Sequence, residues 1–66
     1  MWRYAITYPD GKHDIYLLVQ DKNKYRFVST EQRKVLVPVF DTVSDALNIL
    51  DAFKETKYIA EWEVIE

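Results

Sequence analysis

The chain has 66 residues, no cysteine and a net charge of −2. A chain of this length forms one domain at most, here expected to span residues 1–66, and its small core leaves little margin of stability. The missing cysteines exclude disulfides and thiolate chemistry, and one glycine is too few for a glycine-rich phosphate loop. With 48% hydrophobic and 15% aromatic residues, the composition favours a compact fold over a disordered chain.

Charge is distributed unevenly along the chain. Residues 1–40 have a net charge of +3, whereas residues 41–66 have a net charge of −5. Such asymmetry bears on the choice of partner rather than on the fold. No apolar stretch is long enough to span a membrane, and the sequence does not begin like a signal peptide. We therefore expect a soluble protein of the cytoplasm (the host cytoplasm if a phage encodes it) with no membrane partner.

The first predicted element is a hairpin. Residues 2–8 alternate in size, which is typical of a strand, and place Trp2, Tyr4, Ile6 and Tyr8 on one face. The segment "YPDGKHD" follows at residues 8–14. Its Pro9 and Asp10 suit the centre of a type I turn, and Gly11 supplies the positive φ of the adjoining bulge. Turn chemistry alone thus explains a cluster that otherwise suggests a site.

The returning strand, His13 to Gln20, is apolar on both faces near its middle. Two-sided apolarity is typical of a central strand or of a sheet whose second face meets something. We expect one face to meet the helix and the other to lie on the far side of the sheet. The helix-facing set is Ile6, Ile15, Leu17, Val19 and Trp62, and the far set is Tyr16, Leu18 and Tyr25.

The rest of the chain predicts two or three strands and one helix. After a polar turn, Tyr25 to Ser29 reads as a short strand, and Val35 to Phe40 as an edge strand or extended connector because Pro38 cannot donate to a ladder. A helix follows Thr42, which caps it in a capping-box-like start with Asp45. Its apolar stripe comprises Ala46, Leu47, Ile49, Leu50 and Phe53.

A half-buried strand around Trp62 closes the chain. The predicted order is therefore β-β-β-(β)-α-β. This order gives an α+β fold in which an antiparallel sheet of four or five strands carries one amphipathic helix on one face.

Candidate catalytic residues are sparse. His13 is the only histidine, and neither serine lies in a motif typical of a nucleophile. A metal site would need His13 with Asp10 and Asp14, but residues 13 and 14 of a strand point to opposite faces. We expect no catalytic residue, no metal and no cofactor, and hence no enzyme.

Three surfaces are candidates for binding. The first is the far face of the sheet, formed by Tyr16, Leu18 and Tyr25, since exposed apolar patches often mark protein interfaces. The second is an acidic surface of Asp45, Asp51, Glu55, Glu61 and Glu63. The third is a basic and aromatic segment, Lys22, Lys24, Tyr25, Arg26 and Phe27, whose residue types can hold single-stranded nucleic acid.

Four segments give the chain a resemblance to small α+β proteins encoded by phages and mobile elements of Gram-positive bacteria. They are the Asp10-Gly11-Lys12 turn, the polar turn "DKNKY", the helical segment "VFDTVSDALNILDAF" and the closing "AEWEVIE". The valine- and proline-containing "VLVPVF" departs from the shorter entry to the helix that this group has. The resemblance implies a stoichiometric binder that covers a host or defence protein, in some cases by imitating nucleic acid with carboxylates.

The leading hypothesis is a non-enzymatic protein-binding module, a phage-encoded inhibitor or modulator of a host or defence protein. One alternative is a single-stranded nucleic-acid-binding protein that uses the segment from Lys22 to Phe27. Another is a homodimeric structural or accessory protein. The sequence leaves open which of these surfaces binds.

Overall fold

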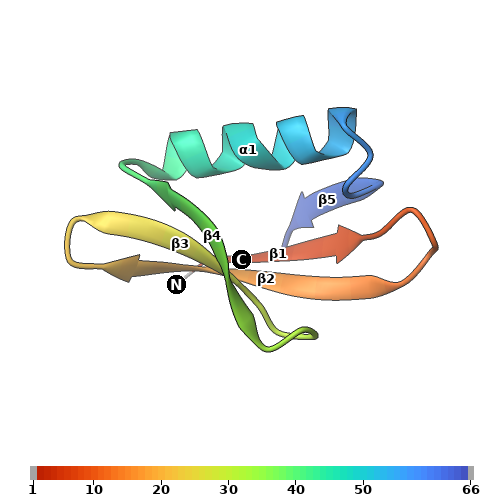
Figure 1. Ribbon diagram of the computed structural model, residues 1–66, viewed down its shortest axis with the longest axis horizontal. Coiled ribbons are helices and arrows are strands. Elements are labelled where there is room, and N and C mark those ends of the chain that lie inside the picture. The colour runs from red at the N-terminus through yellow and green to blue at the C-terminus, as the bar shows by residue number, and fades with distance from the viewer. Residues whose placement is uncertain (1, 66) are drawn as a thin grey trace.

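A computed structural model describes residues 2–65, which form five strands and one helix. In chain order the elements are β1 (Trp2–Thr7), β2 (His13–Asp21), β3 (Lys24–Ser29), β4 (Lys34–Phe40), α1 (Val43–Glu55) and β5 (Glu61–Val64). The strands form one antiparallel sheet in the order β4-β3-β2-β1-β5, and α1 lies over one face of it (Figure 1). The predicted α+β fold with one helix on an antiparallel sheet is confirmed.

The hairpin of β1 and β2 has the predicted turn. The Gly11 amide donates to the Tyr8 carbonyl at 2.9 Å, the Tyr8 amide donates to the Lys12 carbonyl at 2.8 Å, and Gly11 has a φ of 89°. This three-residue loop sets the register of the two strands, so that Tyr4 lies opposite Tyr16. Side chains directly opposite each other share a face, so the turn determines which residues of β2 face the helix.

Both ends of α1 are closed by local hydrogen bonds. At the start, the Thr42 hydroxyl accepts from the Asp45 amide at 3.0 Å, as predicted for the cap. At the end, Lys57 adopts a φ of 64° and the Tyr58 amide donates to the Phe53 carbonyl at 2.9 Å, which is a Schellman motif. The reversal brings the chain back to the sheet as β5. Within residues 2–65, no helix is long and apolar enough to cross a membrane.

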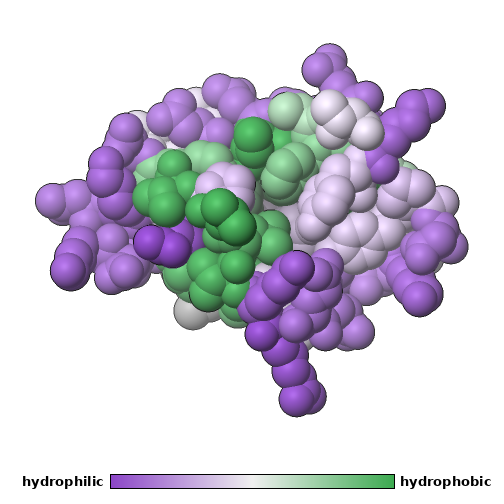
Figure 2. Space-filling view, in the orientation of Figure 1, coloured by the Kyte–Doolittle hydropathy of each residue, from purple (hydrophilic) through white to green (hydrophobic). Residues whose placement is uncertain are grey.

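Strand β4 lies at an edge of the sheet and is irregular. Its register with β3 shifts by two residues between the Arg26–Val39 and Val28–Val35 pairs, and Pro38 falls in that shift. A proline that cannot donate is tolerated at such a bulge. Of the two predicted alternatives, an edge strand and an extended connector, the structure has the edge strand. Val37, beside it, is 90% exposed. Figure 2 shows hydrophobic residues gathered over β4.

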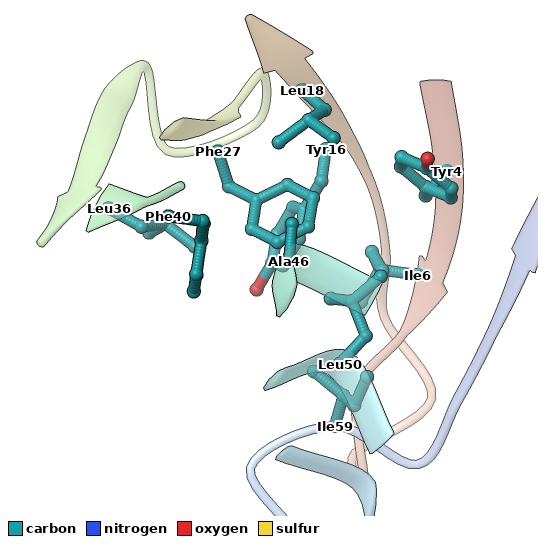
Figure 3. Close-up of a cluster of buried hydrophobic side chains, with 10 residues drawn as sticks. All are labelled: Tyr4, Ile6, Tyr16, Leu18, Phe27, Leu36, Phe40, Ala46, Leu50 and Ile59. Carbon is teal, nitrogen blue, oxygen red and sulfur yellow. The ribbon is translucent and has the colours of Figure 1, made fainter. Parts of the chain in front are cut away.

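The core lies between the sheet and α1, and is built largely from aromatic side chains (Figure 3). Phe27 is at its centre, with ring centroids 5.7–6.0 Å from those of Tyr4, Tyr16 and Phe40. Such tilted and edge-to-face pairs add stabilisation beyond the area they bury. The buried hydrophobic residues are Tyr4, Ile6, Tyr16, Leu18, Phe27, Leu36, Phe40, Ala46, Leu50 and Ile59.

The predicted face of β2 is wrong. Tyr16 and Leu18 are fully buried under the helix, whereas Ile15, 38% exposed, lies with Leu17 and Val19 on the opposite face. Both faces of β2 are apolar, so the alternation of side chains could not show which face meets the helix. Asp14 lies on the same face as Tyr16, and its carboxylate is buried and fully hydrogen-bonded.

Candidate functional site

One face of the sheet carries α1, and the other, here called the open face, has no element of residues 2–65 packed on it (Figure 1). Strand register places apolar side chains side by side across its centre, where Val28 lies opposite both Leu17 and Val35. Val35, Val39 and Ile15 are 51%, 44% and 38% exposed. The apolar residues of the open face are Ala5, Ile15, Leu17, Val19, Val28, Val35 and Val39.

Charged side chains border this apolar centre on two sides. Arg26 lies between Val19 and Val39, and Arg33 lies in the turn from β3 to β4. Glu63 lies opposite Ala5 on β5, at the other edge of the sheet. Within the described residues, neither Arg33 nor Glu63 takes part in an ion pair. Arg3, which lies opposite Leu17 on β1, adds a cation to this face next to the β5 edge.

A buried carboxylate lies at the end of the sheet, beside the β3–β4 turn. Asp14 is 3% exposed, and its Oδ2 accepts from the Tyr8 and Ser29 hydroxyls, each at 2.6 Å. Its Oδ1 accepts from the amides of Ile15 and Glu31 at 2.7 and 3.1 Å. Because Asp14 belongs to β2 and Glu31 to the turn, the carboxylate fixes the turn against the sheet.

The same hydrogen bonds control ionisation. Burial alone would raise the pKa of the Asp14 carboxyl, but hydrogen bonds from Ser29, Tyr8 and two amides hold that pKa below its ordinary value. Burial raises the pKa of the Tyr16 phenol, which lies 3.1 Å from the Tyr8 hydroxyl. Since Tyr8 gives its own proton to Asp14, Tyr16 is the donor in this pair. Both oxygens of the Asp14 carboxylate accept hydrogen bonds from the protein. The cluster therefore stabilises the fold and leaves no carboxylate oxygen free to act as a base.

His13 takes no part in this cluster. Its Nδ1 lies 3.4 Å from the Thr7 hydroxyl, and no hydrogen bond within residues 2–65 joins it to Asp14 or Ser29. Ser29 is completely buried and donates to a carboxylate rather than to a histidine. The arrangement therefore lacks the nucleophile–base–orienter geometry of acyl transfer.

The basic and aromatic segment predicted for nucleic acid does not form one surface. Phe27 is 1% exposed in the core, and Tyr25 packs edge-on against Trp2 on the helix side of the sheet. Arg26 points to the open face, and the Lys24 ammonium forms an ion pair with Asp41. Because alternate residues of a strand point to opposite faces, the aromatic rings cannot stack bases beside these cations. Lys22 lies in the exposed β2–β3 turn.

The acidic set is also divided. Three of the acidic residues, Asp45, Asp51 and Glu55, are exposed on α1. The other two, Glu61 and Glu63, lie on β5. Two of the carboxylates have partners within the chain. Asp51 accepts a hydrogen bond from the Trp62 indole at 3.0 Å, and Glu61 forms an ion pair with Lys54 at 2.8 Å. The hydrogen bond and charge of Lys54 lower the pKa of Glu61. The helix carboxylates and Glu63 therefore present their charge on different layers.

Of the residues predicted to bind through the sheet, Tyr16 and Leu18 are buried and Tyr25 is partly buried on the helix side. Residues assigned to the core, Ile15, Leu17 and Val19, instead form the middle of the open face. The signal that could have found them is the hairpin turn, which fixes Tyr4 opposite Tyr16. Comparison of the chain with protein-family models, with curated proteins and with solved structures gives no match.

Proposed function

We propose that the protein is a non-enzymatic protein-binding module whose open face docks on the surface of another protein. The observation that carries the proposal is the uncovered apolar centre of the open face, from Ile15 and Leu17 across Val28 to Val35 and Val39. Contiguous exposed apolar patches with a charged border are typical of protein interfaces.

The face is a better candidate than either edge of the sheet. Pro38 and the register shift disrupt the free edge of β4, and β5 has four residues. Short or bulged edges with proline resist pairing with another strand. Docking through side chains of the open face needs no such pairing.

Binding by surface coverage agrees with the resemblance to small phage proteins, which predicts inhibition or modulation of a host or defence protein. Catalysis has no comparable support, because Asp14 is saturated with donors and Ser29 is buried. A nucleic-acid-binding role is disfavoured by the placement of Tyr25 and Arg26 on opposite faces. The origin of the chain and the identity of a foreign partner stay predictions.

Site-specific photo-crosslinking in cells tests the proposal. Val28 is replaced by benzoylphenylalanine in one variant, and the exposed helix residue Asn48 in a matched control. We expect a discrete adduct of defined mass from position 28 and none from position 48. Equal, diffuse labelling from both positions, or no adduct at position 28, would contradict a binding role for the open face.

A further inference from the structure

We infer that the open face binds an amphipathic helix of another protein, whose apolar stripe crosses the sheet obliquely and whose carboxylates lie along one side of that stripe. The inference rests on the proposed function and states the chemistry of the partner. It follows from the course of the apolar residues across three strands and from two arginines that lie on one side of them.

The exposed apolar residues form a band that runs obliquely across the open face. From β2 across β3 to β4, its members are Ile15, Leu17, Val28, Val35 and Val39. Val39 lies two strands from Ile15 and, through its pairing with Arg26, is level with Val19, four residues farther along β2. With strands about 4.8 Å apart and a rise of about 3.4 Å per residue, the band is about 17 Å long.

A single helix matches this band in length and width. A length of about 17 Å corresponds to about eleven helical residues, or about three turns. An amphipathic helix of this length presents apolar side chains at positions i, i+4, i+7 and i+11. Its diameter of about 10–12 Å spans two to three strands, so it covers the band without covering the whole sheet.

Two arginines lie along the same side of the band. Arg3 lies opposite Leu17 on β1, and Arg26 lies between Val19 and Val39 and is partly buried. Arg3 also takes part in another interaction within the chain. A guanidinium has five N–H donors, so each arginine can bind a carboxylate of a partner in addition. We therefore expect Asp or Glu on the side of the partner helix that lies over these arginines.

The carboxylates of the open face lie farther from the band. Glu63 is on the β5 edge, two strands from β2, and Asp21 is the last residue of β2. Glu61 and Lys24 are each held by an ion pair. On the other side of the band, the β3–β4 turn has one acidic and one basic residue, whose charges cancel. The charge that borders the band is therefore positive, and it is confined to the arginine side.

A second sheet fits this face less well than a helix does. Stacked sheets lie about 10 Å apart and bury the inner face of each sheet. Such a layer would bury the guanidinium groups of both Arg3 and Arg26, and a buried charge without a partner is costly. A helix on the band leaves both arginines at its border, where its own carboxylates can reach them.

Selection from a library of helical peptides tests the inference. Displayed peptides of about 16 residues are long enough to form a helix in water. Their stripe positions are aliphatic or polar, and their flanking positions are Glu, Lys or Gln. We expect the folded chain to enrich peptides with aliphatic residues at i, i+4, i+7 and i+11 and with Glu on one flank. Enrichment of basic or neutral flanks would overturn the inference.

Charge reversal locates the acidic flank of the bound peptide. The Kd of the most enriched peptide is measured by fluorescence anisotropy, and Arg26→Glu should raise it about tenfold, because an attraction becomes a repulsion. A peptide with Lys in place of its flanking Glu should recover binding to this variant. Lys57→Glu makes the same charge change after the end of α1 and is the matched control.

A polar substitution locates the apolar stripe. Val35→Gln should raise the Kd at least tenfold, because it places an amide in the apolar contact. Val64→Gln makes the same change on the helix side of β5 and should leave the Kd unchanged; the two valines are 51% and 57% exposed. Circular dichroism checks that each variant is folded. A Kd that is insensitive to Val35→Gln or to Arg26→Glu would overturn the inference.

The outcomes distinguish this inference from the proposed function. A position-28 adduct to another protein in cells, without enrichment of acid-flanked helices, would overturn the inference and support the proposed function. A position-28 adduct with the mass of two chains would assign the open face to a second copy and would also overturn the inference. The absence of both an adduct and an enriched peptide would overturn both proposals.

Discussion

The two faces of the sheet differ in the size of their apolar side chains more than in their polarity. The covered face has aromatic rings, including Tyr16 and Phe27, which reach across to α1. The open face has aliphatic and β-branched side chains, such as Val28 and Ile15. Aromatic rings bury more apolar area than short aliphatic side chains do, so the face that carries them gains more from being covered by α1. Side-chain volume is therefore the better guide to which face of a two-sided sheet meets the helix.

The largest expected effect compares two neighbouring leucines of β2. Leu18 is fully buried under α1, whereas Leu17 lies on the open face. Leu18→Ala should lower the free energy of unfolding by about 3 kcal/mol, through lost burial and a residual cavity. Leu17→Ala should cost the monomer about 1 kcal/mol or less, because its side chain is only partly buried. Urea denaturation of the dilute protein measures both.

Equal losses of unfolding free energy in Leu18→Ala and Leu17→Ala would contradict the difference between the two faces, since they would mean that both faces are packed within one chain. Tyr16→Ala belongs with Leu18→Ala and should unfold the protein rather than act on a binding surface.

Asp14 offers the next largest effect, on the covered face. Asp14→Asn replaces a carboxylate that accepts from four donors at 2.6–3.1 Å. An amide cannot accept from all of them, so we expect a loss of about 2 kcal/mol in the free energy of unfolding. The β3–β4 turn should also lose hydrogen-exchange protection at the Glu31 amide. Full protection of that amide in the variant would show that the turn is held by other contacts.

The pH dependence of stability follows from the same group. The pKa of Asp14 is lower in the folded state than its unfolded value of about 3.9. Its contribution is therefore complete above that value and is lost as the pH falls below it, through the folded pKa. Thermal unfolding from pH 6 to pH 2 should show this loss in the wild type and a smaller loss in Asp14→Asn. Parallel pH profiles would assign the acid sensitivity to other carboxylates.

The smallest expected effect is on the open face. Val28→Thr exchanges a methyl group for a hydroxyl while keeping a β-branched shape, and Val28 is only partly buried. We expect the free energy of unfolding of the monomer to change by less than about 0.5 kcal/mol. Chemical denaturation of the dilute protein, with Val64→Thr as a matched control, measures it. A loss above 1.5 kcal/mol would mean that Val28 is part of the core.

Much of the fold could be predicted from local signals. The Pro9–Gly11 turn, the Thr42 cap and the apolar stripe of α1 depend on neighbouring residues, and each was correctly predicted. Pro38 limited this segment to an edge strand or an extended connector, because a missing donor has the same effect in any sheet, and the segment is an edge strand. These features need no knowledge of what lies across the sheet.

The face of β2 could not be read from that strand alone, because Leu17 and Leu18 are equally apolar. The hairpin turn determines this face, because it sets Tyr4 opposite Tyr16 and so places the aromatic residues of β1 and β2 on the same side of the sheet. The burial of Asp14 depended on donors from Ser29 and Glu31, which are remote in sequence. The two-residue register shift in β4 likewise arises from tertiary packing. The residues of the open face were mispredicted because Leu17 and Leu18 are equally apolar.

Solvent paramagnetic relaxation enhancement of methyl signals tests the difference between the two faces most directly, because it measures how close each methyl group lies to water. The chain is labelled with ¹³C at its methyl groups, and a soluble gadolinium chelate is added to the dilute protein. We predict strong enhancement for Ile15 and Val35 on the open face, and almost none for Leu18 and Leu50 in the core. Enhancement of Leu18 as strong as that of Ile15, or protection of Ile15 and Val35 as complete as that of Leu18, would contradict this assignment of the faces.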